Sequence, residues 1–318
     1  MSNVLRRALL ALAALGFSAG AHAQTYGIAT MQPGTLNHTT GSAIARVLKE
    51  KGGINMLVQA TAGESVLLPL VHRGEADLGI SNIAEVVEAY EGRARAGKQD
   101  KLRMIGAIHP LRTPFFVRKD SDIKSVGDLK GKRVPLGFSA MGTINTTVLA
   151  ILAGAGLTER DVRGVLVPNV VRGAEEFASG NADSFFFALG GAKVNEVDAT
   201  VGGVRVLNIP DTPEVLAAMR KNFPYVYLTA VSPRPGLTGV LEPVNVFTYD
   251  NVLVVSADTK DDVVYKIIDT LAKNKAELVA TAPQLNELTV AGLYKKYPIP
   301  YHPGALKYFQ DNKIEPRS

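Results

Sequence analysis

Hydrophobic and polar positions follow two recurring patterns along this chain, one typical of strands and one typical of helices. A short apolar run predicts a strand at 26–31, and apolar residues three and four apart predict a helix that ends at Gly52-Gly53. The same order repeats, with strands predicted at 54–59, 78–81 and 102–108 and helices predicted at 66–73 and 83–90. This alternation favours parallel strands covered by helices on both faces.

A second series of the same kind begins near residue 115. Its predicted strands are 115–118, 132–138, 165–168, 182–188 and 204–209, and its predicted helices are 143–153, 174–179 and 213–221. Prolines and glycines crowd the stretch 231–243, which predicts an irregular crossing segment. A strand at 244–256 and a helical tail follow. We therefore predict an α/β fold of two lobes, each a mainly parallel sheet flanked by helices. Lobe one comprises 24–114 plus 231–318, and lobe two comprises 115–230.

The first 23 residues have the three-part pattern of a secretory signal peptide. Arg6 and Arg7 precede an apolar run at 8–17, and Ala21-His22-Ala23 offers small residues for cleavage before Gln24. The alternative is an uncleaved anchor, but the apolar run is shorter than the roughly 20 residues that a membrane span needs. We expect a signal peptide at 1–23 and a mature protein in the periplasm.

Composition excludes several classes of protein. The chain of 318 residues has no cysteine, so we expect no disulfide, thiolate metal site, iron–sulfur cluster, thiol nucleophile or lipid-anchored lipoprotein. The formal net charge is +5, and the basic residues are scattered, which does not favour nucleic acid as a partner. The histidines beyond residue 24 (His38, His72, His109 and His302) form no pair four residues apart, so we expect neither a metal site nor a cofactor.

Three loops with many uncharged donors follow predicted strands, where ligands of parallel sheets bind. Helix N-termini at such places favour anions. The candidate ligand-binding residues are Thr30, Gln32, Thr35 and Asn37 in the first loop, Ser81 and Asn82 in the second, and Ser139, Met141 and Thr143 in the third. Phe187 and Gly190 follow the predicted strand 182–188 and are further candidates for the cleft. Arg172, just before a predicted helix, is a candidate partner for a carboxylate.

The third loop, at 137–143, matches neither the phosphate-binding loop of nucleoside triphosphatases nor the nucleophile elbow of hydrolases. Thr143 stands where a phosphate-binding loop needs lysine, and a glycine follows Ser139 one position too late for a nucleophile elbow. Two interpretations of Ser139 remain equally open: binding a ligand, or capping the helix. Glu85 and Glu88 share one helix face, which we expect to face water.

Several stretches resemble a known family of proteins. Residues 122–134 (Asp-Ile-Lys-Ser-Val-Gly-Asp-Leu-Lys-Gly-Lys-Arg-Val) are similar to the phrase that opens lobe two in many type II periplasmic binding proteins. Residues 62–80, 137–143 and 177–187 resemble, more narrowly, the TAXI family of TRAP-transporter solute receptors. The resemblance extends over essentially the whole mature chain.

The resemblance implies a soluble, monomeric receptor, not an enzyme, that closes two lobes over a small organic acid such as an amino acid, a 2-oxoacid or a dicarboxylate. It also implies docking on the membrane subunits of a sodium-driven TRAP symporter. The first loop departs from the family: residues 28–37 read Ile-Ala-Thr-Met-Gln-Pro-Gly-Thr-Leu-Asn where members usually carry Gly-Thr-Gly-Gly. The ligand is therefore not carried over from glutamate-binding relatives.

Two other functions remain open from the sequence. One is a periplasmic sensor that partners a membrane kinase, which a neighbouring kinase gene would favour over a neighbouring permease gene. The other is an enzyme on the same two-lobed architecture. The predicted signal peptide and the isolated histidines oppose the enzyme.

Overall fold

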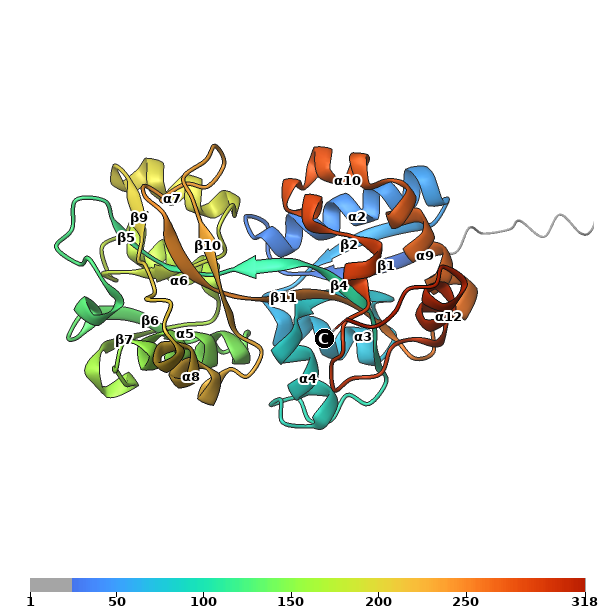
Figure 1. Cartoon of the computed structure of the whole chain (residues 1–318), viewed down its shortest axis with the longest axis horizontal. Coiled ribbons are helices and arrows are strands. Elements are labelled where there is room, and N and C mark those ends of the chain that lie inside the picture. The colour runs from blue at the N-terminus through green and yellow to red at the C-terminus, as the bar shows by residue number, and fades with distance from the viewer. Residues whose placement is uncertain (1–24, 318) are drawn as a thin grey trace, which may run out of the picture.

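The computed structural model describes residues 25–317, and these form two groups of elements joined by long strands (Figure 1). The predicted signal peptide, 1–23, lies outside the described residues. The first group lies on the right of Figure 1 and contains β1 (Thr25–Thr30), α2 (Leu36–Gly52), β2 (Asn55–Ala60), α3 (Glu64–His72), β3 (Leu78–Asn82), α4 (Ile83–Glu91), α9 (Asp261–Lys273), α10 (Lys275–Thr281), η3 (Pro283–Glu287), α11 (Val290–Leu293) and α12 (Pro303–Asp311).

The second group lies on the left of Figure 1. It contains β5 (Phe115–Arg118), η1 (Val126–Leu129), β6 (Arg133–Gly137), α5 (Gly142–Gly154), η2 (Glu159–Asp161), β7 (Arg163–Val167), α6 (Val170–Ala178), β8 (Phe185–Phe186), α7 (Ala192–Val201), β9 (Val204–Val206), α8 (Pro213–Asn222) and β10 (Tyr227–Val231). Between residues 25 and 317, no helix is long and apolar enough to cross a membrane.

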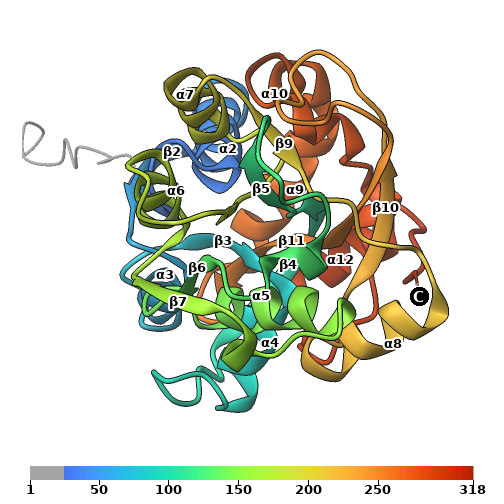
Figure 2. The same ribbon diagram turned by 90° about the vertical axis from the view of Figure 1, so that its left-hand side faces the viewer.

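Two long strands, β4 (Leu102–Arg112) and β11 (Val244–Ser256), connect the groups. They pair with each other in antiparallel fashion from Leu102 opposite Ser256 to Arg112 opposite Thr248. In Figure 2, which looks at the molecule from the side of the second group, both strands lie near the centre with helices around them. The chain therefore leaves the first group along β4 and returns to it along β11.

The strand pairing is mixed, which corrects the prediction of mainly parallel sheets. In the six-stranded sheet, with order β10-β11-β3-β1-β2 and β4 on β11, only β1 pairs in parallel, with β2 and β3. β11 is antiparallel to β3, β4 and β10. In the second group β5 is antiparallel to β8 and β9, and β6 is parallel to β7. The difference arises because one strand must leave and another must return between the groups, and such neighbours run in opposite directions.

The predicted strand at 182–188 is also mostly wrong. Only Phe185 and Phe186 form ladder pairs, with Phe116 and Phe115. The apolar side chains there serve a packed core: the rings of Phe185 and Phe116 stack with centroids 4.8 Å apart, and Phe177 lies 4.9 Å from Phe185. A continuous apolar run identifies a buried segment, but it does not by itself require a long strand.

Two hydrophobic clusters support the fold. One lies between α2, α9, α12 and the sheet of the first group, where Ile44, Ile267 and Phe309 are buried. The other is shared by both groups, since it includes Leu67 of α3 together with Val148 of α5. The two groups therefore meet through an apolar contact and not only through the connecting strands. The boundaries of the two lobes at 115 and 231 stay a prediction.

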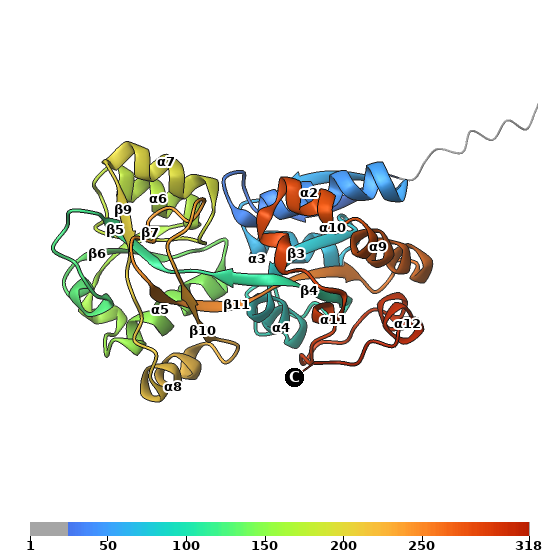
Figure 3. The ribbon, with the colours of Figure 1, turned by 45° about the horizontal axis from the view of Figure 1, so that its top comes forward.

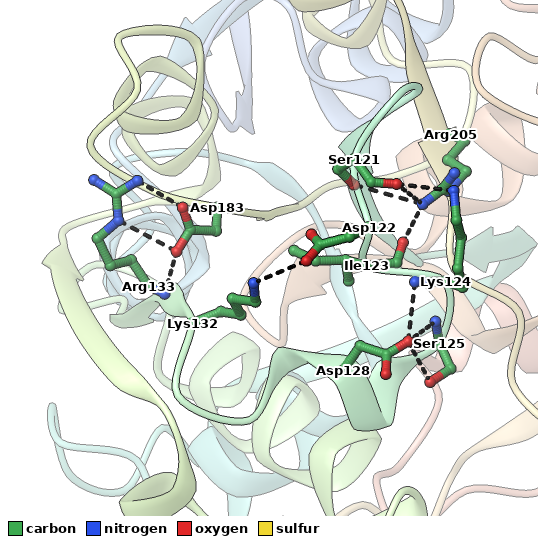
Figure 4. A network of polar contacts seen from close by, with 10 residues as sticks. All are labelled: Ser121, Asp122, Ile123, Lys124, Ser125, Asp128, Lys132, Arg133, Asp183 and Arg205. Carbon is green, nitrogen blue, oxygen red and sulfur yellow. Dashed lines mark hydrogen bonds and ion pairs between the residues drawn. The ribbon is translucent and has the colours of Figure 1, made fainter.

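Most residues of a network of polar contacts belong to the segment 122–134, whose sequence resembles periplasmic binding proteins (Figure 4). The Asp128 carboxylate accepts hydrogen bonds from the N–H groups of Lys124 (3.0 Å) and Ser125 (2.9 Å). Arg133 pairs with Asp183 at 2.6 Å. These contacts stabilise the connection between β5 and β6. None of the residues in them lines the cavity described next.

Candidate ligand site between the two groups

A cavity lies between the two groups, with lining residues from both. Met31, Asn37 and Glu64 come from the first group, and Met141, Val170 and Phe187 come from the second. Apolar side chains dominate the lining, and no lysine, arginine or histidine of the described chain takes part. This mostly apolar cavity has a volume of about 30 Å³, room for one or two water molecules, so a small organic solute fits there only when the two groups stand further apart.

The first predicted loop contributes Thr35 and Asn37 to this cavity. The Thr35 hydroxyl caps α2 by accepting a hydrogen bond from the His38 N–H at 3.1 Å. Asn37 Oδ1 accepts from the Met31 N–H (2.8 Å), and its Nδ2 donates to the Ile80 carbonyl (2.7 Å). Both side chains therefore shape the cavity wall at the start of α2, where the first N–H groups of a helix have no partner within the helix.

Thr30 and Gln32 serve the turn itself. The Thr30 hydroxyl donates to the Met31 carbonyl at 3.0 Å, and the Gln32 carbonyl accepts from the Thr35 hydroxyl at 2.7 Å. Figure 3 shows this loop, in blue before α2, beside α7 of the second group, where the Lys193 N–H donates to the Gly34 carbonyl at 3.1 Å. The loop at 30–37 therefore contacts the second group, although Thr30 and Gln32 do not line the cavity.

The N–H groups predicted to bind an anion at 137–143 are occupied by a carboxylate of the protein itself. Glu85 Oε2 accepts hydrogen bonds from the Thr143 N–H (2.8 Å) and the Thr143 hydroxyl (2.7 Å) at the start of α5. Glu85 Oε1 accepts from the Ser65 hydroxyl at 2.5 Å, and Ser65 Oγ accepts from the Gly142 N–H at 3.0 Å. A helix N-terminus stabilises a negative charge, and here the first group supplies it.

The prediction that Glu85 faces water is therefore wrong. Its side chain belongs to a residue only 3% exposed, because α4 turns this face toward α5. Asn82 completes the contact: its Oδ1 caps α4 by accepting from the Glu85 N–H (2.8 Å), and its Nδ2 donates to Thr143 Oγ1 (3.0 Å). Ser81 is fully buried beside it in β3. Glu85 and Asn82 connect the two groups, whereas the Ser81 hydroxyl donates to the Asn82 carbonyl at 3.4 Å, and none of the three lines the cavity.

Glu64, at the start of α3, lines the cavity and is buried to 2% exposure. Its Oε1 accepts a hydrogen bond from the Asn82 N–H at 3.2 Å, whereas its Oε2 has no partner among the described residues. Burial, and secondarily the negative charge of Glu85, raise the pKa of the Glu64 carboxyl to about 8.

Tyr249, in β11, is the second polar group of the cavity wall without a partner. The residue is fully buried, and its hydroxyl finds no hydrogen-bond partner in the described chain. Burial, and secondarily the charge at Glu64, raise the pKa of the Tyr249 hydroxyl well above its usual value. The cavity wall thus carries two unsatisfied polar atoms, Glu64 Oε2 and Tyr249 Oη.

Met141 and Phe187 line the cavity as apolar surfaces, in line with the candidates from sequence. Gly190 lines instead a second, larger cleft of about 720 Å³, together with Arg112 and the loop around Gly236. Next to it, a Cβ on Gly191 would meet the Phe187 ring at 2.7 Å. This glycine makes room for Phe187 and not for a ligand's approach to the backbone.

Two further candidates do not reach the cavity. Arg172 is 55% exposed in its side chain and pairs with Glu175 (3.2 Å) and Glu176 (2.6 Å) of its own helix, because its position on α6 points away from the other group. Ser139 is exposed, and the residue at the N-cap of α5 is Met141, without a side-chain cap. The structure therefore gives Ser139 neither a capping role nor a place in the cavity wall.

Sequence reasoning missed Glu64, Tyr249 and the bridging role of Glu85. Glu64 lies in the loop between the predicted strand 54–59 and the predicted helix 66–73, which is the same kind of position as the three selected loops. Tyr249 lies inside the predicted strand 244–256, where Thr248, Asp250 and Asn251 are also polar, so no local signal distinguishes its hydroxyl. Within the described residues, no cluster of three His, Asp or Glu side chains suits a metal ion.

The arrangement of two α/β groups around a cavity is the architecture of periplasmic binding proteins. A substrate-binding protein of an amino acid ABC transporter aligns with a TM-score of 0.52 and 12% identity, over 82% of this chain and 99% of that one. A binding component of an ABC phosphonate transporter from Pseudomonas aeruginosa aligns with a TM-score of 0.52 and 12% identity, over 83% and 79%. Residues 28–312 match the NMT1-like family, and the chain belongs to that family.

Proposed function

We propose that this protein is an extracytoplasmic solute receptor that captures a small organic carboxylate by closing its two groups of elements over it. The observation that carries this proposal is the cavity between the groups, with walls from both. A site divided between two bodies is complete only when they meet, so solute binding and closure are linked. The first turn of α2 offers N–H groups suited to a carboxylate there.

We further propose that the receptor delivers its solute to a sodium-driven TRAP-type symporter. This partner rests on the resemblance of 62–80, 137–143 and 177–187 to TAXI receptors. The solved structures that share the fold come from ABC transporters, so an ABC permease is the second candidate partner. Solute uptake by proteoliposomes that contain the permease encoded beside this protein's gene distinguishes the two candidate partners. A symporter needs a sodium gradient, whereas an ABC permease needs ATP.

Native mass spectrometry of the protein purified without added solute, followed by calorimetry, tests the receptor function. We expect a bound small molecule or micromolar binding of at least one amino acid, 2-oxoacid or dicarboxylate. Closure on binding should lower the radius of gyration in X-ray scattering. If no carboxylate binds and no molecule is carried through purification, the proposed function is wrong.

A further inference from the structure

The cavity wall holds two buried polar atoms that the protein leaves unsatisfied. Glu64 Oε2 and Tyr249 Oη both belong to residues that line the cavity, and neither has a hydrogen-bond partner in the described chain. Burying a polar group without a partner costs free energy comparable to a lost hydrogen bond, and a charged group costs more. A solute that supplies the missing partners removes this cost when it binds.

The charges around the cavity determine which kind of solute can supply partners to Glu64 Oε2 and Tyr249 Oη. The lining contains no lysine, arginine or histidine, and Glu85 lies close enough to raise the pKa of Glu64. Glu85 itself is already satisfied by Ser65 and Thr143. A negatively charged group of the solute beside Glu64 would be repelled by the Glu64 carboxylate, with no cation nearby to offset the repulsion. A positively charged group of the solute would instead form an ion pair with Glu64.

The other residues that line the cavity determine which chemical groups the rest of the solute can carry. Ile144, Val170 and Phe187 of the second group line the cavity together with Met31 of the first group and Leu111 of the connecting strand β4. Aliphatic and aromatic surface of this kind favours an apolar group and provides no partner for a second charged group at that end of the solute.

We propose that the solute carries a protonated amine on a small aliphatic body, and that the amine donates to Glu64 Oε2 and to the Tyr249 hydroxyl. This inference rests on the proposed receptor function and narrows its solute class. Among small carboxylates it selects aliphatic amino acids over 2-oxoacids and dicarboxylates, since the first turn of α2 remains available for the carboxylate. A plain aliphatic amine is the other source of the same ammonium group.

Matched pairs of compounds test the amine directly by calorimetry. The probes are alanine, valine and leucine, each paired with its 2-oxoacid (pyruvate, 3-methyl-2-oxobutanoate and 4-methyl-2-oxopentanoate), together with 3-methylbutylamine. We expect the best amino acid to bind at least 10-fold more tightly than its 2-oxoacid, which lacks the donor for Glu64. Binding of 3-methylbutylamine in preference to every 2-oxoacid would equally support recognition of the ammonium group.

Two variants connect that preference to the cavity wall. Glu64→Gln keeps the shape of the side chain but removes its charge, and we expect it to weaken amine binding about 10- to 100-fold while changing 2-oxoacid binding little. Tyr249→Phe removes only the hydroxyl, and we expect a smaller loss. Glu88→Gln is the matched control, because Glu88 lies outside the cavity lining, and amine affinity should not change.

The outcomes separate this inference from the proposed function. Equal or tighter binding of the 2-oxoacids by the unmodified protein would overturn the inference and leave the receptor function intact. Retention of full amine affinity by both Glu64→Gln and Tyr249→Phe would also overturn it. If neither the probes nor any co-purified molecule binds, the receptor function itself is wrong.

Discussion

Two carboxyl groups that lie close together in this protein have opposite environments. The Glu85 carboxylate accepts three hydrogen bonds, from the Ser65 hydroxyl and from the N–H and hydroxyl of Thr143, whereas the Glu64 carboxyl accepts one, from a backbone N–H. Donors stabilise the ionised form of a carboxyl group, and burial without donors stabilises the neutral form. The protein's own donors therefore satisfy the Glu85 carboxylate at the contact between α4 and α5, whereas Glu64 keeps one carboxyl oxygen free for a further partner.

The raised pKa of Glu64 makes stability depend on pH. Its pKa is about 8 in the folded protein against 4.5 for the unperturbed group, so the neutral form favours folding. That contribution is fully present below about pH 4.5 and is lost as the pH rises through 8, at about 1.4 kcal/mol per unit of pKa difference. We expect Glu64→Gln to have a higher melting temperature than the unmodified protein at pH 9.

Thermal unfolding at pH 5 and pH 9 without solute checks this prediction. At pH 5 the two proteins should unfold at similar temperatures, because Glu64 is then neutral in the folded state. A constant difference at both pH values would show that the pKa of Glu64 is not raised.

At the scale of single elements, the close approach of α3 to α5 depends on one small residue. A Cβ on Gly63 would lie 2.3 Å from the Ala140 carbonyl oxygen and 2.4 Å from Met141 Cγ. These atoms belong to the opposite group, and the Ser65 N–H donates to the same carbonyl at 3.2 Å. Because Gly63 has an extended backbone that any residue adopts, its importance is steric.

We expect Gly63→Ala to hinder closure without unfolding either group. Solute affinity should fall about 10-fold or more, since the closed form becomes less populated, and the radius of gyration with solute present should rise. Gly127→Ala is the matched control, because a Cβ there meets only Ser125 Oγ at 3.5 Å. Unchanged affinity of Gly63→Ala would show that α3 and α5 do not approach this closely in solution.

Helices and strands were both predicted where local signals are strong. The α8 helix spans Pro213–Asn222 against a predicted 213–221, and β11 spans Val244–Ser256 as predicted. Thr212 caps α8 by accepting a hydrogen bond from the Val215 N–H. Helix α7 (Ala192–Val201) was not predicted, although Gly202 ends it in the left-handed region. Strand partners depend on distant residues, and so β8 and the antiparallel pairs of β11 were not apparent.

At the scale of the whole molecule, Glu85 acts as a bridge between the two groups. It joins α4 to the first turn of α5, and a hydrogen bond to a charged group contributes about 1.5–3 kcal/mol. We expect Glu85→Ala to destabilise the closed arrangement and to increase the radius of gyration of the protein with solute present. Scattering of Glu85→Ala and of the control Glu88→Ala checks this, and identical curves would contradict the bridging role.

The signal peptide is the second prediction at this scale. We expect the protein recovered from the periplasm to begin at Gln24, because Ala21-His22-Ala23 supplies the small residues that precede cleavage. Intact-mass measurement of the periplasmic protein checks the cleavage point. A mass that includes residues 1–23, with the protein in the membrane fraction, would instead show an uncleaved anchor.

The sequence by itself determined the order of elements, the α/β class and the loops where polar groups gather. These features depend on hydrophobic period, caps and turn residues, all of which act over a few positions. Only the tertiary structure decided which polar groups are satisfied: it put the Glu85 carboxylate on the predicted anion site and left Glu64 and Tyr249 without partners. Glu85 and Thr143 are 58 positions apart, and Glu64 and Tyr249, which line the same cavity, are 185 apart, and no local pattern specifies proximity over such separations.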